Sequence, residues 1–394
     1  MSRIKTPHLD ASLLVLGAAI VILLGGAAVG RAWERRYLHA LAPLLFLQKN
    51  QGVALQREAF AQPDLLPFYG SSELVRPAAY KAANFFRTYP TGFNVFPVAR
   101  VGATSLVMLQ KFAAVGTRMR GRKVVISLSP SWFFRRAIPP GYYDGNFSRL
   151  QADELLYGAP FSLELKRDVA RQMLRYPHTL EKSTLLAFAL RQLAKDSPLH
   201  DAIFHALTPL GIVETWILRM QDHFETLIYI LKEKPHLQTG VQPVVRALDW
   251  HNLIGQAAFD AGQRTDVDPE PIGPEAGPGA FLSGEQGAHE WIDFGLLLRG
   301  LDELGARPLL LSMPIDGSYF DRFGVGRPLR DVYYKQVRAL ARAHHVPLVT
   351  FEEHDEDGAF LAGHHDHLSD KGWLYYDQAL DDFFHDRLTA VPGS

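Results

Sequence analysis

A run of twenty residues without one charged side chain, residues 11–30, limits what this chain can fold into. An α-helix rises about 1.5 Å per residue, so about 20 apolar residues cross the ~30 Å hydrocarbon core of a membrane. The position of the run near the start of the chain and its charged flanks favour an uncleaved membrane anchor over a buried core helix. The small residues Ala28 and Gly30, which precede Arg31, leave a cleaved signal peptide as the alternative.

The charges around this run do not fix its orientation. Arg3 and Lys5 precede it, and Arg31, Arg35 and Arg36 follow it. Because both flanks are basic, the positive-inside rule does not place the bulk of the chain on either side of the membrane.

Composition excludes several kinds of site. The chain has no cysteine, which excludes disulfides, thiolate metal sites and cysteine nucleophiles. A cysteine-free chain also suits an oxidising compartment outside the cytoplasm. The net charge of −1 gives no global basic field, so no nucleic-acid partner is expected.

The rest of the chain alternates strands and helices in its first and last parts. Short apolar runs predict strands at residues 65–69, 93–98, 123–128, 308–312 and 346–351. Helical patterns predict helices at residues 105–115, 285–304 and 333–343, and from Lys371 onward. Alternating strands and helices predict an α/β fold with a parallel sheet covered on both faces.

The same patterns divide the chain into six segments. We expect a tail and transmembrane anchor (1–31), a helical stalk (32–64), the first part of the α/β core (65–147), a helical insertion (148–263), a flexible proline- and glycine-rich loop (264–284) and the second part of the core (285–394).

The first predicted strand runs directly into Gly70-Ser71-Ser72-Glu73. A serine at this place could be a nucleophile, because ligands of parallel α/β sheets bind beyond the carboxyl ends of the strands. Free backbone N–H groups at a helix start could also receive a developing oxyanion. The alternative is a purely structural helix cap, with Ser71 or Ser72 as the capping residue and Glu73 nearby.

A second polar cluster, residues 364–369, precedes the last predicted helix. A serine nucleophile needs a base, usually histidine, so His367 is the candidate. Three histidines and an aspartate at 364–367 also fit metal chemistry. Adjacent residues rarely all face one ion, and no distant partner stands out, so we expect neither a metal nor another cofactor.

Four motifs follow the apolar segment in a fixed order: FYGSSEL (68–74), SLSPSWFF (127–134), SMPIDGSYFD (312–321) and HLSDKGW (367–373). In this combination the chain resembles the DltD family, membrane-anchored proteins of the pathway that attaches D-alanine to cell-surface polymers. The resemblance covers most of the chain from the anchor to the C-terminus. It implies a three-layer, SGNH-hydrolase-like core and a catalytic domain on the extracytoplasmic face of the cytoplasmic membrane.

The resemblance also implies Ser–His–Asp acyl chemistry. Gly70-Ser71-Ser72 aligns with the Gly-Asp-Ser pattern of SGNH hydrolases, which puts the nucleophile at Ser72, with Ser71 as the alternative. The base is His367, and Gly102 matches the glycine whose N–H completes the oxyanion hole.

Two positions depart from that pattern. Asp316 falls where SGNH hydrolases usually carry an oxyanion-binding asparagine, and an ionised aspartate cannot donate a hydrogen bond. Counting back from His367, the family pattern Asp-x-x-His meets His364 instead of aspartate. The carboxylates that could orient His367 in its place are Asp366, Asp355 and Asp357; a Ser72–His367 dyad is the other possibility.

These observations predict a membrane-anchored serine acyltransferase or esterase that transfers D-alanyl groups to a teichoic acid or another envelope glycan. The partners that the resemblance implies are a membrane-bound O-acyltransferase, a D-alanyl carrier protein and the polymer acceptor. Hydrolysis, by an esterase or thioesterase, is the alternative reaction. The missing aspartate motivates a non-enzymatic alternative, a degraded scaffold that binds the carrier and the acyltransferase.

Overall fold

The computed structural model describes residues 7–237, 245–256, 277–362 and 367–388. Its centre is a parallel sheet whose strand order is β2-β1-β3-β4-β5. The strands are β1 (Leu65–Gly70), β2 (Asn94–Ala99), β3 (Lys123–Leu128), β4 (Arg307–Ser312) and β5 (Leu348–Val349). Each coincides with a predicted strand, so the α/β prediction is confirmed.

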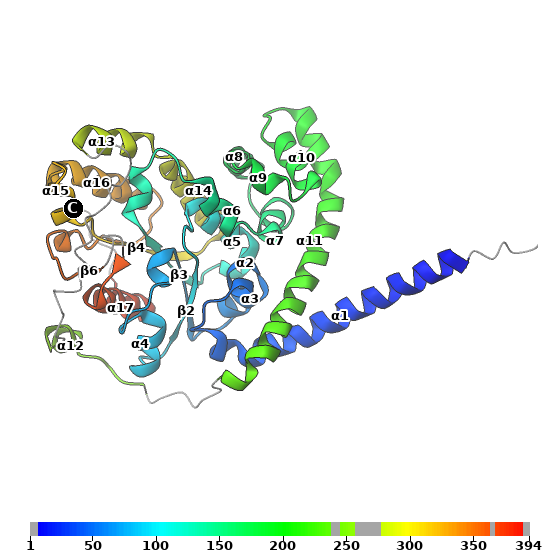
Figure 1. The fold of residues 1–394 in the computed structure, drawn as a ribbon, viewed down its shortest axis with the longest axis horizontal. Coiled ribbons are helices and arrows are strands. Elements are labelled where there is room, and N and C mark those ends of the chain that lie inside the picture. Colours follow the sequence, from blue (N-terminus) through cyan, green and yellow to red (C-terminus); the bar gives the residue numbers. More distant parts are fainter. Residues whose placement is uncertain (1–6, 238–244, 257–276, 363–366, 389–394) are drawn as a thin grey trace, which may run out of the picture.

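Helices cover both faces of this sheet (Figure 1). On one face lie α5 (Ser105–Val115), α14 (His289–Leu304) and α16 (Arg327–Ala343); on the other lie α4 (Ala82–Thr88) and α17 (Asp370–Phe384). Alternate residues of a strand point to opposite faces, and Tyr69 and Phe68 accordingly belong to different core clusters. The nearly continuous burial of the strands follows from this double cover.

The predicted helical insertion is a layer beside the sheet. Its helices are α6 (Pro140–Asn146), α7 (Arg149–Asp153), α8 (Leu163–Met173), α9 (Pro177–Leu180), α10 (Thr184–Leu193) and α11 (Pro198–Glu233), with a π-helical turn at Glu154–Gly158. Helix α11 is 36 residues long and contacts α10, α7 and the N-terminal helix. The helix α12 (Trp250–Gln256) follows and contacts α17.

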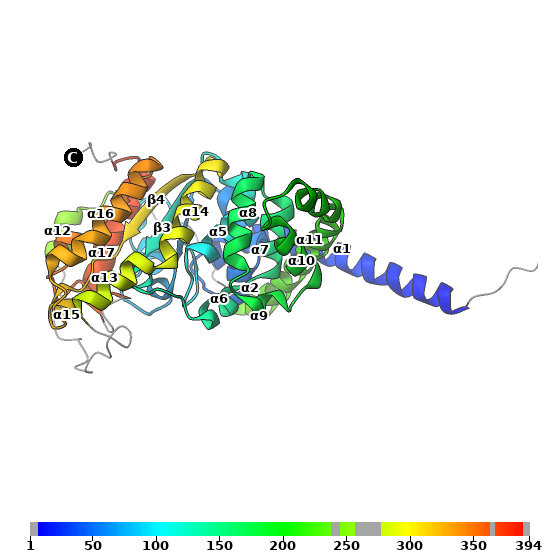
Figure 2. The same ribbon diagram turned by 90° about the horizontal axis from the view of Figure 1, so that it is seen from above.

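The apolar segment is part of one long helix, α1 (Pro7–Leu41), which extends beyond the expected anchor into the expected stalk. Its first half projects from the rest of the molecule (Figures 1 and 2), and apolar side chains such as Leu14 and Val21 are exposed there. By length and composition, residues His8–Leu41 include a candidate membrane span. Such an exposed apolar helix near the N-terminus fits a membrane anchor.

The second half of α1 is fastened to the core. Leu38 and Leu41 are buried in the larger core cluster. The short helices α2 (Leu47–Gln51) and α3 (Ala54–Ala61) follow and lead into β1. Lys49 lies on α2, and its buried ammonium donates hydrogen bonds to the carbonyl oxygens of Ala42 (2.6 Å) and Leu44 (2.8 Å) in the link between α1 and α2. The expected stalk is therefore packed against the domain.

The expected loop at residues 264–284 is helical at its end, because α13 occupies Pro278–Gly287. Proline is compatible with the first turn of a helix, so Pro278 starts α13 instead of excluding it. Residues 264–276 lie outside the described residues.

Near the C-terminus, β6 (Leu361–Ala362) and β7 (His367–Leu368) pair antiparallel, with Ala362 opposite His367. Short elements complete the description: η1 (Ser72–Leu74), η2 (Gly116–Met119), η3 (Pro130–Phe134), η5 (Lys234–His236), α15 (Gly317–Asp321) and η6 (Glu352–His354).

Candidate active site

The predicted serines lie at the point where the strand order of the sheet reverses. Strand β1 is flanked by β2 and β3, so the connections that leave β1 and β3 run to opposite sides of the sheet. In doubly wound α/β proteins the loops separate at this point and leave a crevice where ligands bind. Ser71 and Ser72 directly follow the last residue of β1, Gly70.

Ser71 is buried, with 2% of its surface exposed. Its Oγ accepts a hydrogen bond from the backbone N–H of Gly102 (3.1 Å), and its own N–H donates to Oε1 of Glu73 (2.7 Å). The Glu73 contact resembles half of a capping box. The Ser71 hydroxyl does not cap η1, since it makes no hydrogen bond to that turn; it links β1 to the loop after β2.

Ser72 differs from Ser71 in its surroundings. It begins the 3₁₀ turn η1 and is half-buried, so part of its side chain remains accessible. An acyl donor has to reach the nucleophile, and of the two serines Ser72 offers the more accessible hydroxyl. This exposure favours the predicted assignment of Ser72.

Gly102 occupies a position that only glycine fits without strain. Its φ of +79° lies in the region that L-residues rarely adopt, and a Cβ there would stand 2.3 Å from Cδ1 of Tyr142. The Tyr142 ring in turn packs edge-on against Trp132, in the SLSPSWFF motif. The tight loop aims the N–H of Gly102 at Ser71.

His367 lies on β7, which is in contact with η1, the turn that begins with Ser72. The imidazole is 6% exposed and interacts electrostatically with the carboxylate of Glu73. The fold thus brings together two segments almost 300 residues apart in the chain, one that begins with Ser72 and one that begins with His367. The hydrogen bond from the Gly102 N–H to Ser71 connects Gly102 to the same region.

Glu73 is a candidate site residue that the sequence patterns presented only as a helix-capping candidate. Its side chain is fully buried, and burial raises the pKa of the carboxyl; the Ser71 N–H, the Ser127 hydroxyl and His367 act in the opposite direction. The hydroxyl of Tyr376 also lies nearby and interacts with the side chain of Ser127. The signal in the sequence was its place directly after the two serines, but nothing there placed it beside His367.

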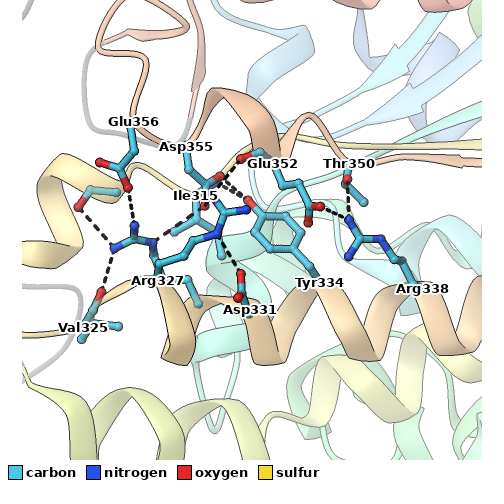
Figure 3. Close-up of polar contacts among 12 residues, drawn as sticks. Ile315, Val325, Arg327, Asp331, Tyr334, Arg338, Thr350, Glu352, Asp355 and Glu356 are labelled. Atoms are coloured by element: carbon cyan, nitrogen blue, oxygen red, sulfur yellow. Dashed lines mark hydrogen bonds and ion pairs between the residues drawn. The ribbon is translucent and has the colours of Figure 1, made fainter. Parts of the chain in front are cut away.

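Asp355, a candidate for the third member, belongs to a buried network (Figure 3). Its Oδ1 accepts from the Tyr334 hydroxyl (2.5 Å) and the Ile315 N–H (3.1 Å), while Oδ2 lies 3.8 Å from Arg330 and 4.0 Å from Arg327. Burial outweighs these favourable contacts and raises the pKa of Asp355 to about 7. These contacts tie the η6 region to the loop after β4.

Two further aspartates that the sequence singled out, Asp357 and Asp316, also have defined partners. Asp357 forms an ion pair with Lys371 (2.7 Å), which contributes to lowering the pKa of its carboxyl although partial burial opposes this. Asp316 caps α15: its Oδ1 accepts from the Tyr319 N–H (3.0 Å) and the Ser318 hydroxyl (2.6 Å). In both contacts the carboxyl oxygen is the acceptor, and an ionised carboxylate has no hydrogen to donate to an oxyanion.

The two remaining candidates, His364 and Asp366, lie outside the described residues. The expectations for them, as the residue at the family's aspartate position and as the nearest carboxylate, stay predictions.

Comparison with known proteins bears on the whole chain. The family model described as "DltD protein" matches residues 45–272 and 282–385. Protein DltD of Bacillus subtilis is 27% identical over 392 residues, which cover 93% of this chain and 95% of the relative. Protein DltD of Staphylococcus aureus is 21% identical over 84% of each chain, and Protein DltD of Lacticaseibacillus rhamnosus is 27% identical over 56% of this chain and 50% of its own. The chain belongs to the DltD family, the family of the D-alanylation pathway that its four motifs indicated.

Proposed function

We propose that this protein is a membrane-anchored serine acyltransferase that passes D-alanyl groups to hydroxyl groups of an envelope polymer, with Ser72 as nucleophile and His367 as base. The observation that carries the proposal is the contact between η1, which begins with Ser72, and β7, which begins with His367. Membership of the DltD family supplies the substrate class.

The chemistry has two steps. The imidazole of His367 takes the proton of the Ser72 hydroxyl as Oγ attacks the acyl carbonyl of a D-alanyl ester or thioester. The bond to the leaving oxygen or sulfur breaks, and the leaving group takes the proton from the imidazolium. An acceptor hydroxyl then attacks the acyl-enzyme with help from the same base, which forms the new ester and restores Ser72.

The developing oxyanion needs N–H donors. The donors that we propose are the backbone N–H of Ser72 and that of Gly102. The Gly102 N–H donates to Ser71 in the resting structure, so it can serve the oxyanion once the Ser71 side chain rotates away. The ionised Asp316 would take no part as a donor, and the oxyanion hole would consist of backbone groups.

Glu73 is our candidate for the negative charge that SGNH hydrolases obtain from aspartate. Its carboxylate is buried and interacts with His367, where it would stabilise the imidazolium that forms during proton transfer. Asp366, for which the structure gives no description, remains the other candidate.

Membership of the family and the apolar helix α1 support the proposed location and partners. The catalytic domain would lie on the extracytoplasmic side of the cytoplasmic membrane, anchored by α1, where the polymer is accessible. The D-alanyl group would arrive through a membrane-bound O-acyltransferase and a small carrier protein. Teichoic acid is the acceptor class associated with the family, and another envelope glycan with free hydroxyls would serve the same chemistry.

A fluorophosphonate probe tests for an activated serine. The full-length protein in detergent or nanodiscs is treated with the probe, and the labelled peptide is identified by mass spectrometry. We expect labelling at Ser72 that Ser72→Ala and His367→Gln abolish and that Ser71→Ala reduces without abolishing. An unlabelled wild type, with an intact fold by circular dichroism, would overturn the proposal.

The scaffold alternative is favoured by one observation, the histidine at position 364 where the family pattern has aspartate. A scaffold would bind the carrier protein and the acyltransferase without reacting. In that case Ser72→Ala would leave D-alanyl esters in the envelope at the wild-type level while deletion of the whole protein lowers them. The acyltransferase proposal predicts the same loss for both strains.

Transfer and hydrolysis are distinguished by the fate of the acyl group. Purified protein is incubated with an acyl thioester donor, with and without a polyol-phosphate polymer. Transfer predicts ester on the polymer and little free D-alanine when the acceptor is present. Hydrolysis predicts free D-alanine at the same rate in both reactions, because water would then be the preferred acceptor.

A further inference from the structure

Helix α11 exposes a continuous apolar stripe on the side of the molecule from which α1 projects. Its residues recur at spacings that fall on one face of a helix: Leu199, Leu210, Val213, Ile217, Ile228 and Leu231. All six are at least 45% exposed. In Figures 1 and 2, α11 lies along the edge of the domain next to the projecting part of α1.

The opposite face of α11 lies against the protein and carries polar groups that bind it. Asp222 accepts from the backbone N–H groups of Val53 and Ala54, both at 2.8 Å, and so caps the start of α3. Arg219 forms a two-fold ion pair with the buried carboxylate of Glu154. The helix buries Phe204, Met220, Leu227 and Ile230 against the protein as well, so the six exposed side chains form a second apolar surface that nothing in the described structure covers.

The membrane anchor lies on the same side of α11 as the apolar stripe. Phe224 continues the stripe between Ile217 and Ile228, and its ring packs against Gly26 of α1. One turn later, Gly30 packs against the backbone of His223, whose ring bonds to Glu34 (2.9 Å). The stripe is thus continuous with the contact that holds the anchor.

We propose that the apolar stripe of α11 lies in the interfacial region of the bilayer that α1 crosses, so that the protein rests on the membrane through two elements. An interfacial helix buries its apolar face at the boundary between headgroups and acyl chains. Trp216 flanks the stripe and is 44% exposed, and tryptophan is enriched at this depth. Docking of α11 fixes the catalytic domain against the membrane instead of leaving it free on a tether.

The proposal rests on α1 as an anchor and is independent of the acyl chemistry. It commits to lipid as the occupant because the stripe adjoins the lipid-exposed part of α1 and a helix of this pattern needs no protein partner to bind a bilayer. A membrane protein covering the same stripe is the competing outcome of the test.

Single-cysteine spin labels test the proposal, and the absence of native cysteine makes the labelling clean. The full-length protein carries a nitroxide at Ile217→Cys, at Ile292→Cys on α14, or at Leu16→Cys on α1. Ile292 is a matched control, since it is 49% exposed against 45% for Ile217. Each variant is reconstituted in vesicles of zwitterionic and anionic phospholipid, and collision rates with oxygen and with a water-soluble nickel chelate are measured.

We expect the label at 217 to favour oxygen over the chelate several-fold, as does the lipid control at 16, while the label at 292 favours the chelate. Equal chelate access at 217 and 292 would overturn the proposal. So would a 217 label that becomes shielded only when the pathway's membrane-bound acyltransferase is reconstituted with it, which would assign the stripe to a protein partner. An aqueous label at 16 would remove the anchor on which the proposal depends. The readout needs no activity, so none of these outcomes bears on the acyl-transfer proposal.

Discussion

The hydroxyl of Ser71 accepts the backbone N–H of Gly102 across 3.1 Å, which joins the end of β1 to the loop after β2 beside the half-buried Ser72. This contact separates the roles of two adjacent serines. Ser71 is buried and links the end of β1 to the Gly102 loop, whereas Ser72 is partly accessible.

Ser72→Ala and Ser71→Ala should therefore differ in kind. We expect Ser72→Ala to lower kcat by about 10⁴ or more with an unchanged melting temperature, since removing a nucleophile abolishes the covalent route. Ser71→Ala should retain measurable activity but destabilise the fold by about 1–3 kcal/mol, because the buried Gly102 N–H loses its acceptor. The two measurements are acyl-transfer kinetics and thermal unfolding; the reverse pattern would make Ser71 the nucleophile.

Glu73→Gln tests the buried carboxylate beside His367. The amide keeps an oxygen acceptor for the Ser71 N–H but removes the negative charge. We expect kcat to fall about ten- to hundredfold, equivalent to roughly 1.4–2.8 kcal/mol of transition-state stabilisation, with little change in KM.

The matched control for this variant is Glu285→Gln, which changes another buried glutamate, on α13. Rescue by Glu73→Asp would support a role for the charge. If Glu73→Gln left the rate at the wild-type value, Glu73 would serve only the fold.

Gly102→Ala should impair the site by two separable effects. Alanine at position 102 would have to adopt a φ of +79°. Its Cβ would also lie 2.3 Å from the ring of Tyr142. Gly121→Ala is the control, since Gly121 has a φ of +67° but no atom within 4 Å of the added Cβ. We expect about 1 kcal/mol of destabilisation at Gly121 from backbone strain and a larger loss at Gly102, accompanied by loss of activity. Equal melting temperatures and rates for the two variants would contradict the close packing of the Gly102 loop.

The buried carboxyl of Glu290 should make the free energy of unfolding depend on pH. Its side chain is buried on α14, Oε1 accepts the Ser105 N–H at 2.8 Å, and burial raises the pKa of the carboxyl to about 7. The folded state holds this proton more tightly than the unfolded chain does. The resulting stabilisation of the fold is therefore complete below the pKa of the unfolded chain, about 4.3, and is lost as the pH rises through the folded pKa of about 7. Asp293, whose pKa is also raised by burial and by Glu290, lies one turn along the helix and adds in the same direction.

Glu290→Gln removes the ionisation and keeps the acceptor for Ser105. One pKa unit corresponds to about 1.4 kcal/mol, so the shift of Glu290 from about 4.3 to about 7 corresponds to on the order of 4 kcal/mol. Between pH 5 and pH 8.5 we expect the wild-type melting temperature to fall more than that of Glu290→Gln. Parallel curves for the two proteins would show that Glu290 is ionised throughout this range.

Local patterns in the sequence predicted much of the architecture. The five strands and the helices α5, α14, α16 and α17 are recognisable because apolar periodicity and strand-ending glycine and serine are local signals. The start of α13 at Pro278 was not predicted, because proline at a helix start and proline in a loop look alike until packing distinguishes them. The continuation of α1 to Leu41 likewise depends on its contact with α11.

The sequence by itself determined the apolar anchor segment, the α/β alternation, the family and the serines and histidine of the candidate site. The tertiary structure decided which groups meet, η1 with β7 and Ser71 with Gly102, and it placed the Glu73 carboxyl where the charge of His367 acts on its pKa. It also placed Asp355, Asp357 and Asp316 in networks with partners of their own. The physical reason is that a strand or helix is coded by neighbours in the chain, whereas hydrogen bonds, burial and electrostatic contacts in a site join residues that only the folding of the whole sheet brings within a few ångströms.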